Sequence, residues 1–479
     1  MAEPQQRLVV GGGIGGLAAG LGLARRGLRV PLLEQASEIG EIGAGIQLGP
    51  NAFAALDALG VGENARGRAV FTDELIMMDA VDASVVGRFP VGEAFRTRFG
   101  NPYAVIHRAD IHTSILEGVR GSDRIQFHTS TKVVRIEQDA SSVTAIDQHG
   151  QRFTADALVA ADGVRSVARD IFFGDTPRVS GHVVYRAVVP LADMPRDLRV
   201  NAPVVWAGPN CHLVHYPLRG GSEYNLVVTF HSRQQEQWSV TDGSKEEVLS
   251  YFQGIHPRPR QLLECPKSWR RWATADRHPI PRWTAGRVTL LGDAAHGMLQ
   301  YLAQGACMAI EDAVTLAEAM KACALDIDRA FALYEQSRIP RTARVVLSAR
   351  EMGRLYHADG VERLVRNQLW EGRTPERFYD ALQWLYGWRA DRRAVPGQSR
   401  LPKQWLTRRA GRAASARLGD LTHAAIRRFV ARYGVDMSEA AEPRIDSYAS
   451  FNDFFTRALR PGARPLAEAD YLCPVDGAI

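Results

Sequence analysis

Residues 1–34 contain apolar runs that are interrupted by one glycine-rich turn. A run at residues 7–10 predicts a short buried strand, and an Ala- and Leu-rich stretch ending near Gly27 predicts a helix. Residues 28–33 predict a second strand that ends at Glu34. The order is β-α-β, and its first turn carries three glycines in GxGxxG spacing: Gly11, Gly13 and Gly16.

Each of the three glycines has its own reason in a dinucleotide-binding turn. The first permits the tight turn, and the second lets a pyrophosphate approach the helix N-terminus, where free N–H groups favour anions. The third lets the helix and the strand pack closely, and an acid in the position of Glu34 accepts hydrogen bonds from a ribose. We therefore predict a Rossmann-like dinucleotide-binding unit at the start of the chain.

The hydrophobic period changes further along. Alternating β-branched residues at 130–160 and 183–232 favour antiparallel sheet over further parallel crossovers. From about 308 to 385 the apolar positions recur with a helical period. Residues 389–403 are rich in charge, Pro, Gly and Ser, which is typical of a linker.

Composition narrows the class of protein without naming it. The chain has 479 residues, of which 46% are hydrophobic and 23% charged, as in ordinary globular proteins. The net charge of +6 is small for this length and does not predict nucleic-acid binding. The five cysteines are widely separated and show no zinc-ligand spacing, so we expect no metal site, no disulfide framework and a reducing cytoplasm. The apolar run at 8–24 is too rich in glycine to suit a membrane helix, and we expect a soluble protein.

Two further motifs follow apolar strands. Asp162 and Gly163 come directly after the strand predicted at 157–160, and Gly292 and Asp293 follow the one at 288–291. With the first glycine turn they resemble, in order, the three fingerprints of the single-component, group A aromatic flavin monooxygenases over about residues 6–390.

The resemblance implies FAD as the cofactor and NADH as a co-substrate. It implies that Asp293 bonds the ribityl chain and that Arg108 lies near the FAD phosphates. The Asp-Gly motif would serve both FAD and the transient pyridine nucleotide. The implied cofactor-binding residues are Gly11, Gly13, Gly16, Glu34, Arg108, Asp162, Gly163, Gly292, Asp293, Gly305 and Ala306.

The same resemblance sets the expected fold class and domains. We expect an α/β protein with a Rossmann-like FAD-binding domain interleaved with an antiparallel-sheet substrate domain, followed by a helical segment and a foreign tail. The expected FAD-binding domain is discontinuous and the substrate-binding sheet domain lies within it. The boundaries are 1–175 with 276–330 for FAD, 176–275 for the sheet, 331–388 for the helical segment, 389–403 for the linker and 404–479 for the tail.

Finer matches at residues 41–51, 211–219 and 300–306 look most like 3-hydroxybenzoate 6-hydroxylases, with salicylate hydroxylases as near relatives. This resemblance implies an active site of Asp73, Tyr103, His212, Tyr216 and Gln300. His212 would act as the base on the substrate hydroxyl beside Gln300, while Tyr103 and Tyr216 would line the ring and carboxylate pocket. A histidine suits this task because its pKa lies near neutrality, and a phenolate is a better nucleophile than a phenol.

Three further positions bear on these assignments. Asp73 has only loosely patterned surroundings, and Asp79 is close by. His296 is expected to support a loop. Relatives commonly carry proline after Gly-Asp-Ala-Ala-His, whereas this chain has Gly297, which leaves the loop freer and puts efficient coupling in doubt.

Past the linker, the sequence resembles the N-terminal part of a phosphatidylserine decarboxylase. The resemblance begins at Leu401, continues through Tyr433 and the segment at Ser450, and reaches Asp476. Asp476 matches that family's catalytic aspartate. The family's histidine and its pyruvoyl-forming serine do not follow before Ile479, so we expect a vestigial or truncated fusion without decarboxylase activity. Residues 403–432 are rich in Arg and Lys, which leaves contact with an anionic membrane as the less favoured alternative to a solvated basic helix.

The predicted function is hydroxylation of 3-hydroxybenzoate to 2,5-dihydroxybenzoate (gentisate), with FAD, NADH and O₂. Salicylate 1-hydroxylation to catechol is the first alternative. The second is a phosphatidylserine decarboxylase-related or membrane-binding module that carries a passenger flavoprotein domain. The expected partners are a small aromatic acid, O₂ and, by family analogy, a second copy in a homodimer.

Overall fold

The computed structural model describes residues 5–38, 44–389, 409 and 411–461. The chain divides into two compact units, residues 1–392 and 393–479, which are described separately. The predicted linker at 389–403 lies almost entirely outside the described residues, as do Leu401, Asp476 and the first part of the motif at 41–51.

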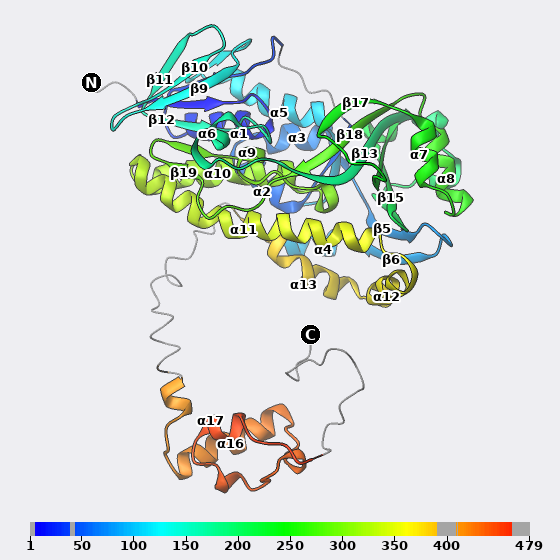
Figure 1. The fold of residues 1–479 in the computed structure, drawn as a ribbon, viewed down its shortest axis with the longest axis vertical. Helices are drawn as coiled ribbons and strands as arrows, with labels where there is room; N and C mark the ends of the chain where they lie inside the picture. Colours follow the sequence, from blue (N-terminus) through cyan, green and yellow to red (C-terminus); the bar gives the residue numbers. More distant parts are fainter. Residues whose placement is uncertain (1–4, 39–43, 390–408, 410, 462–479) are drawn as a thin grey trace. The chain divides into compact units, whose positions relative to one another are not determined.

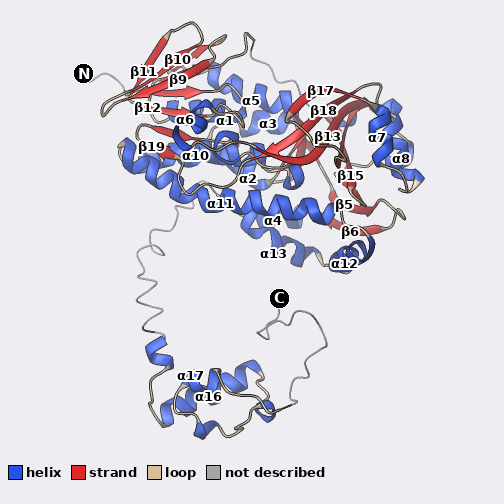
Figure 2. Cartoon of the chain, viewed as in Figure 1, coloured by secondary structure: helices blue, strands red, loops and turns tan. Residues whose placement is uncertain are grey.

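A six-stranded sheet lies toward one side of the first unit, where β12 and β19 are labelled (Figures 1 and 2). β1 pairs in parallel with β2 and β12, and the other parallel neighbours extend the sheet on both sides, with antiparallel β19 at one edge. Its strands in spatial order are β19 (Thr284–Ala285), β20 (Val288–Leu290), β12 (Ala157–Ala160), β1 (Arg7–Val10), β2 (Val30–Leu33) and β8 (Ile125–His128).

The helix after β1 is buried almost all round. α1 (Ile14–Ala24) packs against α5 (Arg108–Arg120) and α10 (Gly305–Ala322), and ten of its residues are buried. A Cβ at Gly22 would lie 3.2 Å from the Ala313 carbonyl oxygen, so the two helix backbones approach closely there. A helix that is apolar on every face needs such neighbours on every side, and this confirms the predicted β-α-β unit.

A mixed sheet of eight strands forms the second layer of the unit (Figure 2). The antiparallel pairing predicted for 183–232 is confirmed, because β13, β16, β15 and β14 pair in that way. Its strands in spatial order are β17 (Ser239–Gly243), β18 (Trp269–Asp276), β13 (Arg178–Pro190), β16 (Glu223–His231), β15 (Cys211–Leu218), β14 (Val204–Gly208), β5 (Glu74–Asp79) and β6 (Val85–Pro90).

The structure corrects two of the expected ranges. β5 and β6 fall within the range 1–175 given to the FAD-binding domain, yet β5 pairs in parallel with β14 of the other sheet. Its side chains at Ile76 and Met78 enter that sheet's core, which explains the placement. Within 130–160, β9 (Val133–Gln138), β10 (Val143–Asp147) and β11 (Arg152–Ala155) are antiparallel, whereas β12 joins the parallel sheet because all its residues are buried on both faces.

Shorter elements complete the first unit. A three-stranded sheet holds β3 (Gly45–Leu48), β7 (Ala104–His107) and β4 (Val70–Phe71). The helices predicted over 308–385 are confirmed as α10, α11 (Ile327–Tyr356), α12 (Gly360–Trp370) and α13 (Pro375–Tyr386). The other helices are α2 (Pro50–Ala58), α3 (Gly62–Arg68), α4 (Glu93–Phe99), α6 (Val167–Phe173), α7 (Lys245–Tyr251), α8 (Pro257–Glu264), α9 (Asp293–His296) and the 3₁₀ turns η1 (Leu191–Asp193), η2 (Arg196–Leu198), η3 (Arg219–Gly221) and η4 (Gln300–Leu302).

The second unit has a small apolar core of its own. α16 (Asp420–Tyr433) packs on α17 (Phe451–Phe455), with Ile426, Tyr448 and Phe454 buried between them. Two 3₁₀ turns, η5 (Met437–Glu439) and η6 (Ile445–Ser447), connect the helices. Leu421 and Phe455 stay more than 60% exposed, so little apolar surface is covered in the described part of this unit.

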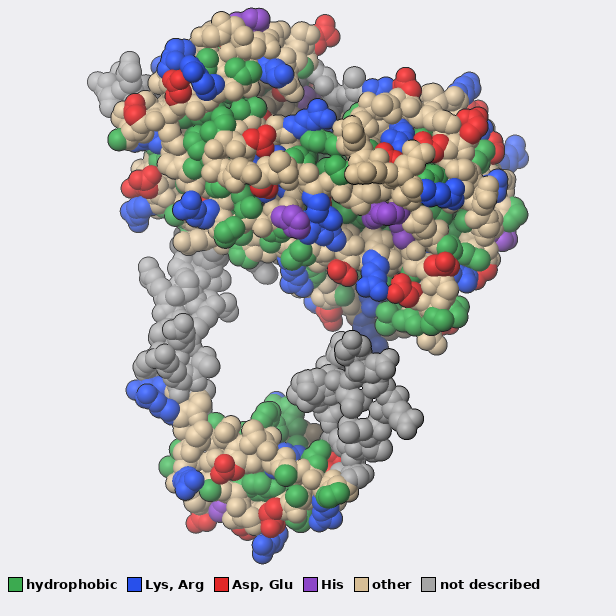
Figure 3. Space-filling view, viewed as in Figure 1, with side chains coloured by type: hydrophobic (Ala, Val, Ile, Leu, Met, Phe, Trp, Pro, Cys, Tyr) green, Lys and Arg blue, Asp and Glu red, His purple; other side chains and the backbone are tan. Residues whose placement is uncertain are grey.

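Basic and acidic side chains are interspersed over the face shown in Figure 3, which fits the modest net charge. Within the described ranges, no helix combines the length and the apolar content needed to cross a membrane.

Candidate active site

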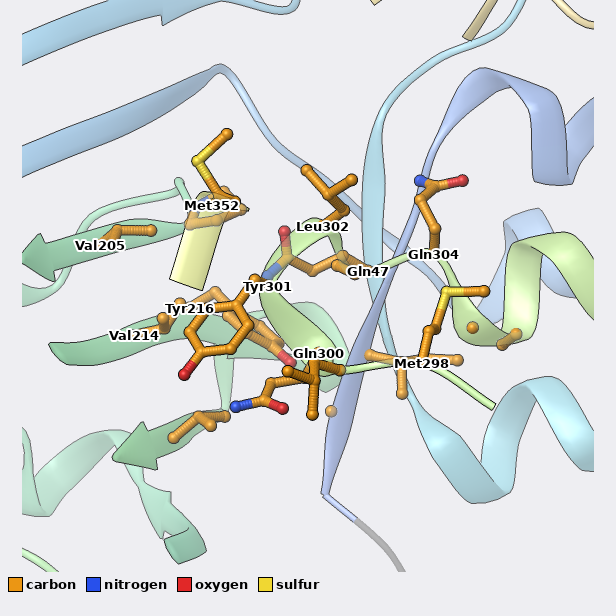
Figure 4. Close-up of a pocket in the computed structure, with 18 of the residues that line it drawn as sticks. Gln47, Val205, Val214, Tyr216, Met298, Gln300, Tyr301, Leu302, Gln304 and Met352 are labelled. Atoms are coloured by element: carbon orange, nitrogen blue, oxygen red, sulfur yellow. The ribbon is translucent and has the colours of Figure 1, made fainter. Parts of the chain in front are cut away.

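A cavity of about 450 Å³ runs from the β1–α1 turn to one face of the eight-stranded sheet. This volume is typical of a ligand site. Glycines and short side chains line one end, while aromatic, amide and imidazole groups line the other. Figure 4 shows several of the aromatic, amide and apolar side chains, with Tyr216, Gln300 and Met298 labelled. The cavity thus brings segments from the first fifty residues into contact with segments beyond residue 350.

The β1–α1 turn cannot tolerate side chains at two of its glycines. Gly11 has φ +108°, and a Cβ there would lie 2.3 Å from the Ala161 carbonyl oxygen. A Cβ at Gly16 would lie 1.8 Å from the Gly11 carbonyl oxygen. At Gly13, the N-cap of α1, a Cβ would meet no atom within 4 Å, so the backbone there faces open space. This is the arrangement in which a helix N-terminus receives a phosphate.

The acid predicted to bind a ribose lies beside the same turn. Glu34 follows β2, and its Oε2 accepts a hydrogen bond from the Gly12 N–H at 2.6 Å, while its Oε1 accepts one from the Ala36 N–H at 2.8 Å. Arg108 begins α5 and lines the cavity.

The second motif contains a half-satisfied carboxylate. Asp162 accepts a hydrogen bond from the Val167 N–H at 2.8 Å through Oδ2, while its buried Oδ1 has no partner. Burial raises the pKa of this carboxyl. Gly163 has φ +79°, and a Cβ there would meet no atom within 4 Å.

The third motif places an exposed carboxylate at the cavity. Gly292 has φ +64° and precedes α9, and Asp293 is the first residue of that short helix. Gly305 and Ala306, which begin α10, lie across from it, and a Cβ at Gly305 would be 4.0 Å from Asp293 Oδ1. Open glycine backbone at Gly13 and Gly163 and the exposed Asp293 line this cavity, whereas Asp162 and Glu34 lie beside its lining. Glycine backbone near a helix N-terminus is the kind of surface that receives a phosphate-bearing cofactor.

Buried charges hold the third motif in place, and sequence reasoning missed them. On α10, Asp312 Oδ2 accepts a hydrogen bond from the Gly292 N–H at 3.0 Å and contacts His296 Nε2 at 2.6 Å. Arg338 of α11 donates to Asp312 and to Glu311, and opposite charges in contact hold the pKa of both buried acids below their ordinary values. His296 therefore supports this loop, as expected. The adjacent acids Glu311 and Asp312 within an otherwise apolar helix are the feature of the sequence that could have predicted this buried cluster.

Gly297 closes α9 with φ −44° and ψ 125°, and its N–H donates to the Asp293 carbonyl at 3.1 Å. Proline could not make this bond. The glycine therefore adds a hydrogen bond to the loop that carries Asp293.

β15 presents alternate side chains to the cavity and to the sheet core. His212, Val214 and Tyr216 line the cavity, whereas His215 faces away and approaches the Leu198 carbonyl oxygen at 3.2 Å through Nε2. Strand alternation thus separates the two histidines that the sequence placed close together.

Gln300 meets His212 through a shared neighbour. Thr229 of β16 is the cross-strand partner of His212, and Gln300 Nε2 donates to its Oγ1 at 3.3 Å. Cross-strand partners point to the same face of a sheet. The structure therefore brings the amide and the imidazole to one end of the cavity. Gln300 and Tyr216 are labelled there in Figure 4.

His212 is buried and electrically neutral. Burial lowers its pKa to about 3, assisted by the nearby His182, so the near-neutral pKa expected from the sequence is wrong for this buried ring. Its Nδ1 lies 2.8 Å from Nε2 of His357, the residue after α11. Because Nδ1 is engaged, Nε2 is the nitrogen left for a ligand in the cavity.

The two predicted tyrosines also line the cavity. The Tyr103 hydroxyl donates to Gln47 Oε1 at 2.5 Å, and burial raises its pKa well above the ordinary value. Burial likewise raises the pKa of Tyr216. Both phenols therefore remain protonated donors at neutral pH.

Asp73 lies apart from these groups. It is exposed, is not among the residues lining the cavity, and accepts a hydrogen bond from Asn201 Nδ2 at 3.1 Å. Asp79 is buried, and its Oδ2 accepts hydrogen bonds from Arg363, Arg366 and Asn367. Asp79, the alternative to Asp73 in the sequence analysis, therefore anchors α12 and lies outside the active site.

Arg186 is a cavity residue that sequence reasoning missed. It lines the cavity from β13, in the same cross-strand row as Val227 of β16 and Val214 of β15. It has no ion pair among the described residues, and its guanidinium lies 5.8 Å from the ring centroid of Trp272. Burial lowers its pKa. An arginine within an otherwise apolar strand is the feature of the sequence that could have predicted a cation in the cavity lining.

Comparisons with known proteins agree with this geometry. The family described as FAD binding domain matches residues 5–349. The chain belongs to this family. A second family, described as PSD, matches residues 393–434, in the tail where the decarboxylase resemblance was noted.

Relatives and solved structures narrow the position within the FAD-binding family. The chain is 68% identical over 381 residues to a 3-hydroxybenzoate 6-hydroxylase of Polaromonas naphthalenivorans (strain CJ2), covering 80% of this chain and 95% of the relative. It is 64% identical over 391 residues to one of Klebsiella oxytoca, covering 82% and 98%. A salicylate hydroxylase substrate complex matches with TM-score 0.69 at 28% identity, covering 81% and 97%. Klebsiella pneumoniae HpxO with FAD and uric acid matches with TM-score 0.70 at 26% identity, covering 80% and 97%. The chain is therefore an FAD-dependent aromatic monooxygenase.

Proposed function

We propose that this FAD-dependent monooxygenase hydroxylates 3-hydroxybenzoate para to its hydroxyl group, giving gentisate, with NADH as the reductant. The observation that carries the proposal is the cavity end where His212, Gln300 and Tyr216 meet Arg186. A base and an amide there suit a phenolic hydroxyl, and a cation that forms no ion pair within the described part of the chain suits a carboxylate. The relatives named 3-hydroxybenzoate 6-hydroxylase support this substrate over salicylate.

The residues around the cavity divide the work. The three glycine motifs with Glu34, Arg108, Asp162 and Asp293 would hold FAD, which when bound supplies the reducing equivalents and the activated oxygen. His212 takes the phenol proton at Nε2, so that electron density rises at the para carbon. Gln300 orients the substrate hydroxyl, and Tyr103 and Tyr216 close the ring pocket against water. Asp73 would have to act from outside the cavity lining, so we give it no role here.

The direct test compares two substrates. Oxygen uptake and product identification are measured with 3-hydroxybenzoate and with salicylate side by side. We expect gentisate from the first and little or no catechol from the second. Catechol and CO₂ as the main products would contradict the proposal and favour salicylate 1-hydroxylation.

Replacing Arg186 with methionine should raise the KM for 3-hydroxybenzoate roughly 10- to 100-fold. A hydrogen bond to a charged group contributes about 1.5–3 kcal/mol, and each 1.4 kcal/mol changes affinity about tenfold. The measurement is KM and kcat of the R186M variant with FAD content checked. Binding of 3-hydroxybenzyl alcohol, which lacks the carboxylate, should hardly change. An unaltered KM for 3-hydroxybenzoate would assign the carboxylate to another residue.

The domain assignment is also a proposal, amended by the strands at 74–90. Among the residues that the structure describes, those lining the cavity end at Tyr386. A chain ending after Trp388 should therefore retain FAD content and hydroxylase activity. Loss of flavin or of folding in the shortened protein would show that residues 389–479 are required by the catalytic unit.

We further propose a homodimer that acts in the cytoplasm, where NADH is regenerated. α12 directs Arg366 inward to Asp79 and leaves Val361, Leu364, Val365 and Leu369 about half or more exposed. A continuous apolar helix face of this kind is typical of an association surface. Sedimentation equilibrium measures the mass directly. A monomer at micromolar concentration would contradict the dimer.

A further inference from the structure

Four histidines from separate segments, His212 among them, form a cluster. His357, which is partly exposed, lies 2.8 Å from His212 through ring nitrogens. The ring of His182 lies 5.4 Å from that of His357, and the ring of His231 lies 5.2 Å from that of His182. His231 is exposed to solvent, and the Tyr301 hydroxyl is hydrogen-bonded to His182 Nδ1. The cluster thus leads from the cavity to the surface.

The hydrogen bond between the first two rings fixes their protonation. Two neutral imidazoles joined by one hydrogen bond share a single proton between the facing nitrogens. His212 can accept a substrate proton at Nε2 only when Nδ1 carries the hydrogen. His212 Nδ1 then donates to His357 Nε2, so His357 must be the acceptor in the resting enzyme.

The surroundings do not stabilise a charge on His212. Burial lowers the pKa of His212 to about 3 and that of His357 well below its ordinary value. Within the described ranges, neither imidazole forms an ion pair, in contrast to His296 with Asp312. A proton taken by His212 therefore cannot rest there and needs a way out. The other titratable groups that face the pair or act on its neighbours are His182, His231, Tyr301, Tyr356, Arg178 and Asp276.

We propose that His357 is a positioning residue that holds His212 with its Nε2 open to the cavity and passes the substrate proton on toward the surface. This proposal rests on the proposed function. The phenol O–H bond breaks, its electron pair stays on oxygen, and an N–H bond forms at His212 Nε2. The Nδ1–H bond of His212 breaks as an N–H bond forms at His357 Nε2, and His357 Nδ1 releases a proton to solvent. The reverse transfer restores both rings when the product oxygen is reprotonated.

Two substitutions of His357 separate its two tasks. His357→Gln keeps an acceptor for His212 Nδ1 and cannot relay a proton, whereas His357→Phe removes both abilities. We expect hydroxylation at neutral pH to slow about 10-fold in the first variant and about 100-fold in the second. Because His212 itself remains in both variants, these losses stay at or below the lower end of the contribution of a general base. His149→Gln, at an exposed turn far along the chain from the cluster, is the matched control and should behave as the wild type.

The decisive readout is ionisation of the bound substrate. The phenolate of 3-hydroxybenzoate is followed by ultraviolet difference absorbance in the oxidised complex across pH. We expect the apparent pKa of the bound phenol to rise in the Phe variant, with FAD content and substrate affinity retained. A wild-type pH profile and rate in that variant would overturn the proposal. So would loss of FAD or substrate binding with an unmoved profile, because His357 would then be structural only.

Failure of the proposed function is recognised separately. If the wild type makes no gentisate, the proposed substrate is wrong, and the pH profile is recorded with whichever phenol the wild type does hydroxylate. A shifted profile with that phenol would still support the relay, and an unshifted one would overturn it.

Discussion

Replacing His212 with alanine should leave FAD bound and slow hydroxylation of 3-hydroxybenzoate by about 10²- to 10⁴-fold at neutral pH, the usual contribution of a general base. The reason is that Nε2 of His212 is the imidazole nitrogen left for the phenol once Nδ1 is engaged by His357. The burial that lowers its pKa to about 3 keeps this nitrogen unprotonated throughout the neutral range. The rate is measured as product formed per flavin.

The loss of rate in the His212→Ala variant should depend on pH. The loss should shrink as the pH rises toward about 10, where a phenol ionises without help. His215→Gln is the matched control, because His215 lies on the same strand and faces away from the cavity. A His212→Ala enzyme that turns over at the wild-type rate at neutral pH would show that His212 is not the base.

Replacing Arg338 with methionine should lower the free energy of unfolding of the catalytic unit by about 3–5 kcal/mol, because removal of one partner leaves a buried charge uncompensated. Arg338 donates to both Glu311 and Asp312, and all three side chains are buried. Arg341 still pairs with Glu311 in the variant, so Asp312 bears most of the loss. Denaturant unfolding followed by flavin fluorescence measures the effect.

The flavin should also be held less tightly in that variant, since Asp312 fixes the Gly292 N–H next to Asp293. Arg354→Met on the same helix is the control. Arg354 pairs with Glu362 at an exposed position, where water and salt screen the pair and it contributes little to stability. Equal loss of stability in the two variants would mean that the buried cluster is not what stabilises this region.

The sequence alone determined the features that depend on local chemistry. The β-α-β unit followed from apolar runs around Gly11, Gly13 and Gly16, because only glycine fits where a Cβ would strike the backbone. The helical region and the antiparallel strands followed from the spacing at which apolar residues recur along the chain. The family and its cofactor followed from three short motifs in order, since such motifs are set by what lies within a few residues of them.

The tertiary structure decided which side chains meet. β5 joins the eight-stranded sheet although it lies within the stretch predicted for the FAD-binding domain, because its partner β14 follows more than a hundred residues later. Asp79 is hydrogen-bonded to Arg366 of α12, and Asp73 lies outside the cavity lining. His357 and Arg186 carried no local motif, yet the packing of α11 and β13 brings one against His212 and the other into the cavity. Contacts between distant segments depend on register and packing, which periodicity along the chain does not encode.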